Sequence, residues 1–437
     1  MLKSYDFSQL NDQELETLLI RNSDSGKEIR TVVEEVIQTV INNGDQALVD
    51  YALKFDQVSL DRLYIDEDEI NTLANSIDRT EKRALEIAFN NIHKFHQTQA
   101  GREKKVETTE GVYCWREARP IEKVGLYIPG GTAVLPSTFL MLGIPARIAG
   151  CREIVICTPP QKNGKINGYI AYCAQLLKID RIYLVGGAQA IAAMAYGTQS
   201  IPKVDKVFGP GNQYVTLAKT IIQNNTQTAI DLPAGPSEVL IIGDKTSNPK
   251  FIAADLLAQA EHGIDSQAIL ASTDRQLIES TNQELSKQLS VLPRKEIAEK
   301  ALMNSYAVYC ETLEEAFSFS NQYAPEHLIV ALDDAESLTR RIVNAGSVFL
   351  GHLTPESLGD YASGTNHTLP TSGYARAYSG VSLDSFIKKI TFQEANKTGL
   401  SNLGPTVEVL AEIEGLQAHK NAVSIRLSSQ TDDWEKN

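Results

Sequence analysis

The sequence predicts an α/β protein with two incomplete Rossmann-like parallel-sheet domains, a helical N-terminal arm and a small C-terminal tail domain. Short apolar runs alternate with helical patterns between residues 123 and 223, and the same alternation starts again at residue 238. Runs such as EVLII at 238–242 are apolar at nearly every position, which is typical of parallel strands buried on both faces. The 437 residues are enough for two or three domains.

The first hundred residues are predicted to be mainly helical. Residues 1–24 resemble a short acidic helical arm, and apolar residues recur at helical spacing over 29–55 and 66–99. His93 and His96 lie one turn apart in the second pattern. That spacing suits a metal, but on an otherwise polar helix a solvated face is the commoner outcome. We expect domains at 1–24, 25–122 together with 237–381, 123–236, and 382–437.

The first alternating run carries three glycine-rich segments at predicted strand ends. The predicted strands are 123–128, 153–157, 181–185 and 206–208, and the predicted helices are 168–177, 188–196 and 214–223. The glycine segments are GLYIPGGT (125–132), LVGGAQA (184–190) and FGPGNQY (208–214). Ligands of such sheets bind at the carboxyl ends of strands, and helix N-termini favour phosphate. None of the segments matches GxGxxG, so each glycine is explained equally well by the turn alone.

The second run and the tail complete the predicted elements. We expect strands at 238–242, 267–270, 307–309, 328–332 and 347–350. We expect helices at 250–260, 275–289 and 313–321, and a further helix that follows the strand at 328–332 and ends at residue 344. In the tail we expect a helix at 405–419 and a short strand at 422–427.

Composition excludes several classes of partner. The formal net charge of -14 argues against nucleic acid and anionic membranes. No apolar run is long enough to span a membrane, and the N-terminus has acidic residues where an export signal needs an apolar core. The five cysteines form no CxxC pair. They predict reduced thiols, mostly in the core of a cytoplasmic protein.

The polar stretch Thr354–Thr371, TPESLGDYASGTNHTLPT, joins glycines to Asp360 and His367. A solvated surface loop and a reactive loop are equally compatible with it. Similar combinations occur elsewhere in the chain. These are Gln259 with His262 in LLAQAEHGIDSQ, Glu326 with His327 in YAPEHL, and Glu414 with His419 in EGLQAHKN.

Each of these pairs also has an ordinary structural explanation. Together they supply the imidazole, carboxylate and amide donors of a catalytic zinc site. They also supply an acid/base pair, Glu326 with His327. The sequence alone does not show which of these groups meet in space.

The chain resembles the histidinol dehydrogenase family over about residues 120–427. The matching stretches, in the family's order, are GLYIPGG, VGGAQAIAAMAYGT, GPGNQYV, DLPAGPSEVLII, DLLAQAEHGIDSQ, YAPEHL, TPESLGDYASGTNHTLPTSGYARAYSGVS and EGLQAHKNAVSIRL. No functional position departs from the family pattern. The glycine segments depart from the usual dinucleotide fingerprint but match this family's own.

The resemblance implies a set of site residues, with one zinc per subunit and NAD as cofactors. Zinc would be held by Gln259, His262, Asp360 and His419. The substrate would be contacted by Ser237, Gln259, His262, His327, Asp360, His367, Glu414 and His419. NAD would be contacted near Tyr127, Gln189 and Asn212. Residues 123–236 would then be the NAD domain, and 25–122 with 237–381 the zinc and substrate domain.

The implied reaction oxidises L-histidinol to L-histidine through L-histidinal with two NAD. His327 would be the general base, and Glu326 would activate water for the second oxidation. The family also implies a homodimer in which the tail, residues 382–437, completes the partner's site. Three alternatives remain open: a zinc hydrolase with Glu326 as base, a dehydrogenase of this scaffold acting on another amino alcohol, and a non-enzymatic α/β binding protein.

Overall fold

A computed structural model describes residues 2–21, 27–101, 103–130, 134–233 and 235–429. The chain divides into two compact units. The first comprises Met1–Gln99 with Ile121–Phe386, and the second comprises Ala100–Pro120 with Ile387–Asn437. Each unit is described by itself.

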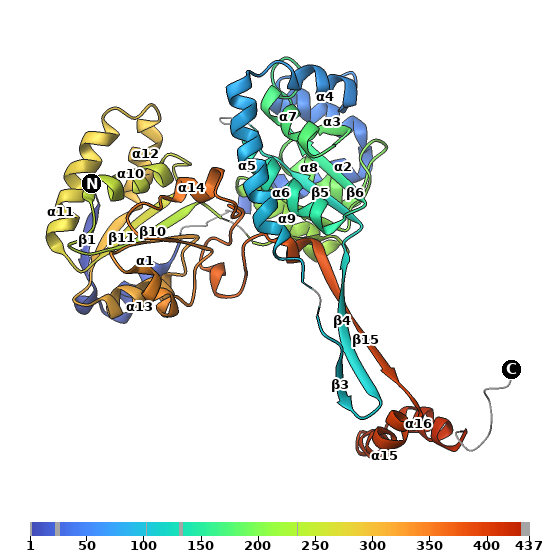
Figure 1. The fold of residues 1–437 in the computed structure, drawn as a ribbon. Helices are drawn as coiled ribbons and strands as arrows, with labels where there is room; N and C mark the ends of the chain where they lie inside the picture. The colour runs from blue at the N-terminus through green and yellow to red at the C-terminus, as the bar shows by residue number, and fades with distance from the viewer. Residues whose placement is uncertain (1, 22–26, 102, 131–133, 234, 430–437) are drawn as a thin grey trace. The chain divides into compact units, whose positions relative to one another are not determined.

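One parallel sheet of the first unit contains the predicted run of glycine-tipped strands (Figure 1). Its strand order is β2-β7-β6-β5-β8-β9, and only β2 runs antiparallel to its neighbour among the described strands. The strands are β2 (Tyr64–Asp66), β5 (Lys123–Tyr127), β6 (Glu153–Thr158), β7 (Arg181–Leu184), β8 (Lys206–Phe208) and β9 (Ala229–Ile230). The helices of this part are α6 (Pro136–Ala149), α7 (Gly168–Leu176), α8 (Gly187–Tyr196) and α9 (Gln213–Asn225). Right-handed crossovers place α6 and α7 on one face of the sheet and α8 and α9 on the other.

The other parallel sheet repeats this order with the second run of strands. Its order is β1-β12-β11-β10-β13-β14, with every described pairing parallel. The strands are β1 (Lys3–Asp6), β10 (Glu238–Gly243), β11 (Gln267–Ser272), β12 (Tyr306–Tyr309), β13 (His327–Ala331) and β14 (Ser347–Leu350). The two sheets therefore share one strand order and differ in the direction of one edge strand. The two-sheet α/β class predicted from the sequence is confirmed.

Both faces of this second sheet are buried, as the continuous apolar runs require. Val239 and Ile241 of β10 lie in one core with α10 (Pro249–Ala260), α11 (Arg275–Leu289) and α12 (Lys295–Met303). Leu240 and Ile242 lie in a separate core with α13 (Leu313–Tyr323) and α1 (Asp12–Leu19). Successive side chains of a strand point to opposite faces, so one apolar strand supplies both cores.

Two expectations about the N-terminal hundred residues are corrected. The expected arm is partly a strand: β1 pairs with β12 and extends the second sheet, while α1 packs on it. Residues 33–92 belong to the core of the first sheet, whereas we expected them with residues 237–381. An amphipathic helix shows that it has an apolar face but not which sheet covers it.

The predicted helix over 66–99 is two helices. These are α4 (Glu67–Ala74) and α5 (Arg79–Gln97), and each begins at a capping box, formed by Asp66 with Glu69 and by Asp78 with Glu81. His93 is half-buried and His96 is fully buried. The solvated face expected for this pair is therefore wrong for His96, whose Nδ1 donates to the Ile92 carbonyl at 2.9 Å.

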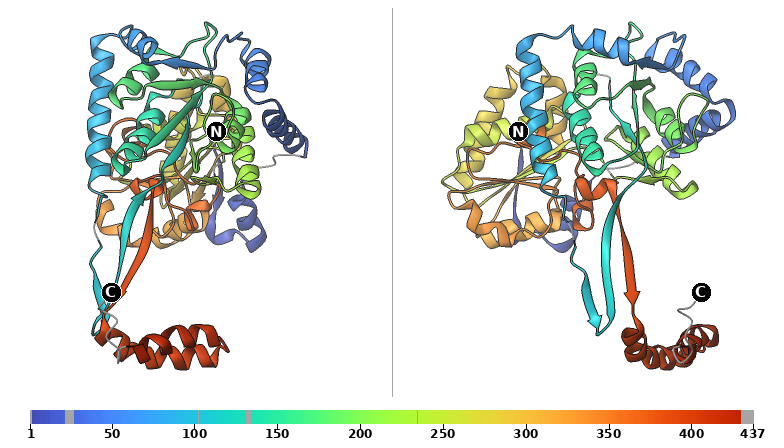
Figure 2. Two further views of the ribbon diagram at one scale, coloured as in Figure 1. Left: turned by 90° about the vertical axis from the view of Figure 1, so that its right-hand side faces the viewer. Right: turned by 45° about the vertical axis from the view of Figure 1, so that its right-hand side comes forward.

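The second unit consists of an antiparallel sheet and two helices, which Figure 2 shows side by side at the end of the strands. The sheet order is β15-β4-β3, formed by β3 (Val106–Thr109), β4 (Val112–Pro120) and β15 (Ile387–Ala395). The helices are α15 (Lys397–Ile413) and α16 (Gln417–Ser429). The strand expected at 422–427 is wrong, because these residues lie within α16. Residues 430–437 of the predicted tail, and Gly131 and Thr132 of the first glycine segment, lie outside the described ranges.

Candidate active site

A histidine and two glutamates meet at the amino ends of β10 and β13. His327 is the first residue of β13 and Glu326 directly precedes it, while Glu238 is the first residue of the neighbouring β10. His327 Nδ1 lies 3.1 Å from the carbonyl oxygen of Glu238. A carbonyl can only accept, so Nδ1 carries a proton. These residues therefore lie at the amino edge of the second sheet, opposite to the strand ends that carry the glycine segments in the first sheet.

The stretch Thr354–Thr371 supplies a short helix to this edge. That helix is α14 (Glu356–Tyr361), which presents Glu356 and Asp360 one turn apart. Asp360 Oδ1 lies 3.2 Å from His327 Nε2, close enough for an ion pair but without the alignment of a hydrogen bond. His262 follows α10 and completes the group, since ligand atoms of His262, Glu356 and Asp360 all lie within 4.8 Å of one another. These donors suit a divalent metal.

Gln259 lies in the last turn of α10 and is fully buried. Neither its amide oxygen nor its amide nitrogen has a hydrogen-bond partner in the part of the chain that the structure describes. An unpaired buried amide is costly, because it loses its bonds to water and gains none. A bound cation would satisfy the oxygen, so the residues present fit a metal at this position.

Burial and carboxylates control the charges of the site. Burial raises the pKa of Glu326 to about 8 and that of Glu356 to about 8. Burial alone would lower the pKa of His327, but Glu356, Glu326 and Asp360 outweigh it and raise that pKa well above its usual range. Desolvation disfavours the charged form of these carboxyl groups, and a cation bound among them would favour that form, so the cavity suits a cation.

His367 connects the site to the other sheet. Its Nδ1 donates to the carbonyl of Asp360 at 3.0 Å, which leaves Nε2 to accept from the Thr138 hydroxyl at 2.9 Å. Burial lowers the pKa of His367, consistent with a neutral ring. Thr138 lies near the start of α6, so the loop containing His367 is fixed to a helix that follows the first glycine segment. Both ring nitrogens of His367 therefore have hydrogen-bond partners within the protein.

The three residues expected near NAD lie at the carboxyl side of the first sheet. Tyr127 ends β5, Gln189 lies in the first turn of α8, and Asn212 caps α9 by accepting from Tyr214 and Val215 N–H. The Tyr127 hydroxyl accepts from Gly187 N–H at 3.1 Å, which joins two glycine segments. For this sheet the glycine segments occupy the expected edge, beside the N-termini of α8 and α9.

A buried ion pair holds the third glycine segment. Lys219 pairs with Asp231; the lysine donates to the Gly209 carbonyl at 3.0 Å and the carboxylate accepts from Gly209 N–H at 2.9 Å. Gly209 has φ +131°, and a Cβ there would overlap the Tyr127 carbonyl oxygen. Only glycine fits this conformation and this contact.

Gly209→Ala is expected to destabilise the protein by at least about 2 kcal/mol, because the backbone strain and the steric overlap add. It is also expected to weaken the NAD binding that the resemblance implies for this segment. The matched control is Gly150→Ala, since Gly150 has φ +83° but open space around its Cβ position. That control should lose about 1 kcal/mol with NAD affinity unchanged. Urea unfolding and a cofactor fluorescence titration measure both quantities, and equal behaviour of the two variants would contradict the role of the contact.

The remaining expected residues divide between the two units. Ser237 directly precedes β10 and is half-buried, adjacent to Glu238. Glu414 and His419 lie in the second unit, at the end of α15 and in α16. The first unit therefore brings together His262, Glu326, His327 and Asp360, and Gln259 lies three residues before His262 at the end of α10. Sequence reasoning missed Glu356, although its spacing of four residues from Asp360 was a readable signal.

The fold and this site define an enzyme of the two-sheet α/β type, with glycine segments at one sheet and a metal-competent His–carboxylate centre at the other. A family model for histidinol dehydrogenase matches residues 19–427. Histidinol dehydrogenase of Bacteroides thetaiotaomicron is 55% identical over 399 residues, covering 90% of this chain and 93% of that protein. The chloroplastic histidinol dehydrogenase of Arabidopsis thaliana is 53% identical over 431 residues, covering 98% and 91%.

A solved structure agrees with these relatives. The crystal structure of histidinol dehydrogenase from Elizabethkingia anophelis superposes with a TM-score of 0.95 at 52% identity, covering 99% of both chains. The chain belongs to the histidinol dehydrogenase family. It is an oxidoreductase, and its family places it in histidine biosynthesis. Within the described ranges, no helix is long and apolar enough to cross a membrane.

Proposed function

We propose that the chain oxidises L-histidinol to L-histidine through L-histidinal, with zinc bound at the site and two NAD reduced in turn. The observation that carries this proposal is the buried His327, whose Nε2 lies 3.2 Å from Oδ1 of Asp360, a member of the metal-competent group. The family membership supplies the substrate class. We retain a cytoplasmic location as part of the proposal, consistent with five cysteines that are all free.

The proposed zinc ligands are Gln259, His262, Asp360 and His419. When bound, zinc would supply a positive charge that orients the imidazole and amine of the substrate. Ser237, His367 and Glu414 would complete the contacts to the substrate. NAD would lie along the carboxyl edge of the first sheet, at Tyr127, Gln189 and Asn212.

Different residues of the chain accept the proton in each of the two oxidations. In the first oxidation His327 Nε2 takes the alcohol proton while a hydride leaves the carbinol carbon for NAD. In the second, Glu326 takes a proton from the water that adds to the aldehyde. The hydrate then gives its hydride to a second NAD and becomes the carboxylate. Glu326 is well placed for this role, because its Oε2 lies 3.6 Å from His327 Nδ1 and accepts from Glu238 N–H at 2.8 Å.

A spectrophotometric assay of NAD reduction tests the proposal. The purified protein should reduce NAD with L-histidinol, lose that activity in a chelator and regain it with zinc. An amino alcohol that lacks the imidazole is the control substrate, and equal turnover of it would favour the alternative of a dehydrogenase for another amino alcohol. Zinc-dependent hydrolysis of an ester or amide substrate, with no reduction of NAD by L-histidinol, would instead favour a zinc hydrolase.

We further propose a homodimer in which the tail of one copy, with Glu414 and His419, completes the site of the other. Mixing His327→Asn and His419→Asn chains tests this directly. Each variant alone should be inactive, but a mixed dimer regains one intact site. Random reassociation of equal amounts should therefore restore about a quarter of the wild-type activity. No recovery, with mixed dimers verified by mass spectrometry, would place each site within a single chain.

A further inference from the structure

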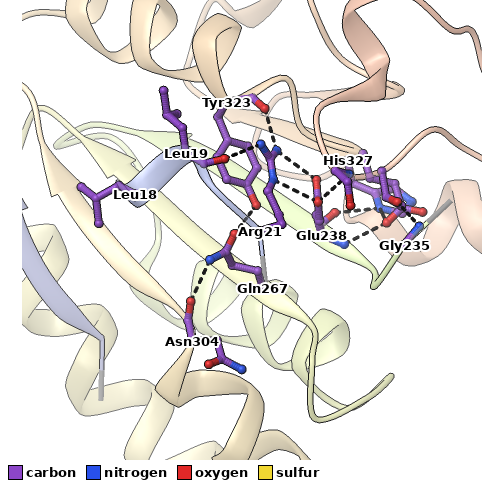
Figure 3. Close-up of polar contacts among 12 residues, drawn as sticks. Leu18, Leu19, Arg21, Gly235, Glu238, Gln267, Asn304, Tyr323 and His327 are labelled. Carbon is purple, nitrogen blue, oxygen red and sulfur yellow. Dashed lines mark hydrogen bonds and ion pairs between the residues drawn. The ribbon is translucent and has the colours of Figure 1, made fainter. Parts of the chain in front are cut away.

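A buried ion pair lies directly behind the candidate active site. Arg21 and Glu238 form a two-point contact, with Nε 3.1 Å from Oε1 and Nη2 3.2 Å from Oε2. Their side chains are only 8% and 1% exposed. Figure 3 shows Arg21 reaching Glu238, which lies between it and His327. This geometry is the bidentate arrangement that arginine makes with a carboxylate.

Arg21 joins several segments at once. Its Nη2 donates to the carbonyl of Tyr323, the last residue of α13, at 2.6 Å, and its guanidinium lies 3.5 Å from the centre of the Tyr323 ring. Its Nη1 donates to the Leu19 carbonyl at 3.0 Å. A cation at the carboxyl end of a helix is favourable. Tyr323 precedes Glu326 by three residues, so Arg21 also fixes the approach to β13.

The backbone of Glu238 holds both proposed proton-transfer groups. Its carbonyl accepts from His327 Nδ1 at 3.1 Å, and its N–H donates to Glu326 Oε2 at 2.8 Å. Its side chain is fixed separately, by Arg21 and by Ser372 N–H, which donates to Oε1 at 2.7 Å. Ser372 follows the loop that contains His367. A shift of the Glu238 side chain would therefore move the backbone groups that orient His327 and Glu326.

We propose that Arg21 and Glu238 are positioning residues that hold His327 and Glu326 in their reactive orientation; their effect on turnover rests on the proposed function. Stability alone is a weak reason to keep such a pair. Buried ion pairs lose their hydration, and apolar replacements are often equally stable. A positioning role explains why the pair sits where two neighbouring strands begin.

Arg21→Met is expected to lower kcat for histidinol about 10- to 100-fold, because small misplacements of reacting groups are costly. KM for both substrates and the zinc content should stay unchanged. Asn282→Ala is the matched control. Asn282 also anchors the N-terminal segment, through Leu2 N–H at 2.8 Å, but has no contact with Glu238. It should lower the unfolding temperature and leave kcat unchanged.

The double variant Arg21→Met with Glu238→Gln separates positioning from stability. A glutamine side chain at position 238 keeps the acceptor for Ser372 N–H and removes the unpaired charge, so folding should recover while kcat stays low. A double variant that recovers wild-type kcat together with its stability would overturn the proposal.

A second measurement does not depend on the substrate. In protein labelled with ¹⁵N-histidine, the His327 Nδ1–H signal, assigned with His327→Asn, reports its bond to the Glu238 carbonyl. The signal should shift or vanish in Arg21→Met and persist in Asn282→Ala. An unchanged signal in Arg21→Met would refute the positioning role. If the signal changes in Arg21→Met while the wild-type protein shows no histidinol oxidation, the proposed function fails and the positioning role stands.

Discussion

His262→Asn is expected to strip zinc from the purified protein and to lower histidinol oxidation at least about a hundredfold. His262 is the imidazole donor that the first unit contributes to the metal-competent group, and it follows α10 directly. Asparagine is shorter and offers an oxygen where zinc favours nitrogen. Dialysed protein analysed by inductively coupled plasma mass spectrometry gives the zinc content. Unchanged zinc in the variant would remove His262 from the ligand set.

Glu356→Gln is the matched control for that experiment. Glu356 lies within the same 4.8 Å group as His262 and Asp360, yet it is absent from the proposed ligand set. Its Oε1 is 3.8 Å from His327 Nδ1, while its Oε2 is buried without a partner among the described residues. Glutamine has nearly the same shape, so zinc should remain at about one per subunit. Loss of zinc would add Glu356 to the ligands.

The central strands of both sheets followed from simple signals, whereas the strand order and the edge strands β1, β2 and β9 were not predicted. A strand buried on both faces must be apolar throughout, so VLII at 239–242 was readable without any partner. Six helices that follow strands (α7, α8, α9, α10, α11 and α13) were predicted within about two residues at each end, for instance α11 at Arg275–Leu289, whereas α6 and α12 were not predicted. Short crossovers of one handedness then leave few topologies. The fold class therefore depends on local pattern, which a sequence contains.

Elements defined by distant partners were missed or wrong. β4 pairs along its whole length with β15, which follows it by more than two hundred residues, and neither strand is an apolar run. The run AVSIRL at 422–427 fits a strand as well as a helix, and its packing in α16 decided the outcome. The helix α6 was not predicted; it contains Pro145, and its residues from Ser137 to Ala146 are buried. Tertiary context overrides such local penalties.

The residues of the site could be predicted from the sequence, but not where in the fold they meet. His327 and Asp360 were identified, whereas their meeting at the amino edge of the second sheet depends on how α10 and α14 return over it. Arg21 had no signal at all. It is one of two basic residues in the acidic segment 1–24, and only the fold brings it to Glu238. Residues that act through a backbone contact leave no motif.

Glu326→Gln is expected to separate the two oxidations. The glutamine side chain keeps an oxygen that accepts from Glu238 N–H, so the fold and the orientation of His327 should persist. It cannot accept the proton of the water that adds to the aldehyde. Oxidation of L-histidinal should therefore fall by about 10²–10⁴, whereas oxidation of L-histidinol to the aldehyde should change less than about tenfold.

The pH dependence of L-histidinal oxidation tests the role of Glu326 independently. Burial raises the pKa of Glu326 to about 8, and a base must be ionised to act. In the wild-type protein, oxidation of L-histidinal should therefore rise with pH through about 8 and level off above it. The Glu326→Gln variant should lack this rise, because an amide does not titrate. Stopped-flow NAD reduction started separately from the alcohol and from the aldehyde measures both steps. Equal losses of rate in the two steps, with the rise of the rate through about pH 8 retained, would assign the activation of water to another residue. Glu356 is the first candidate, because it is also buried beside His327.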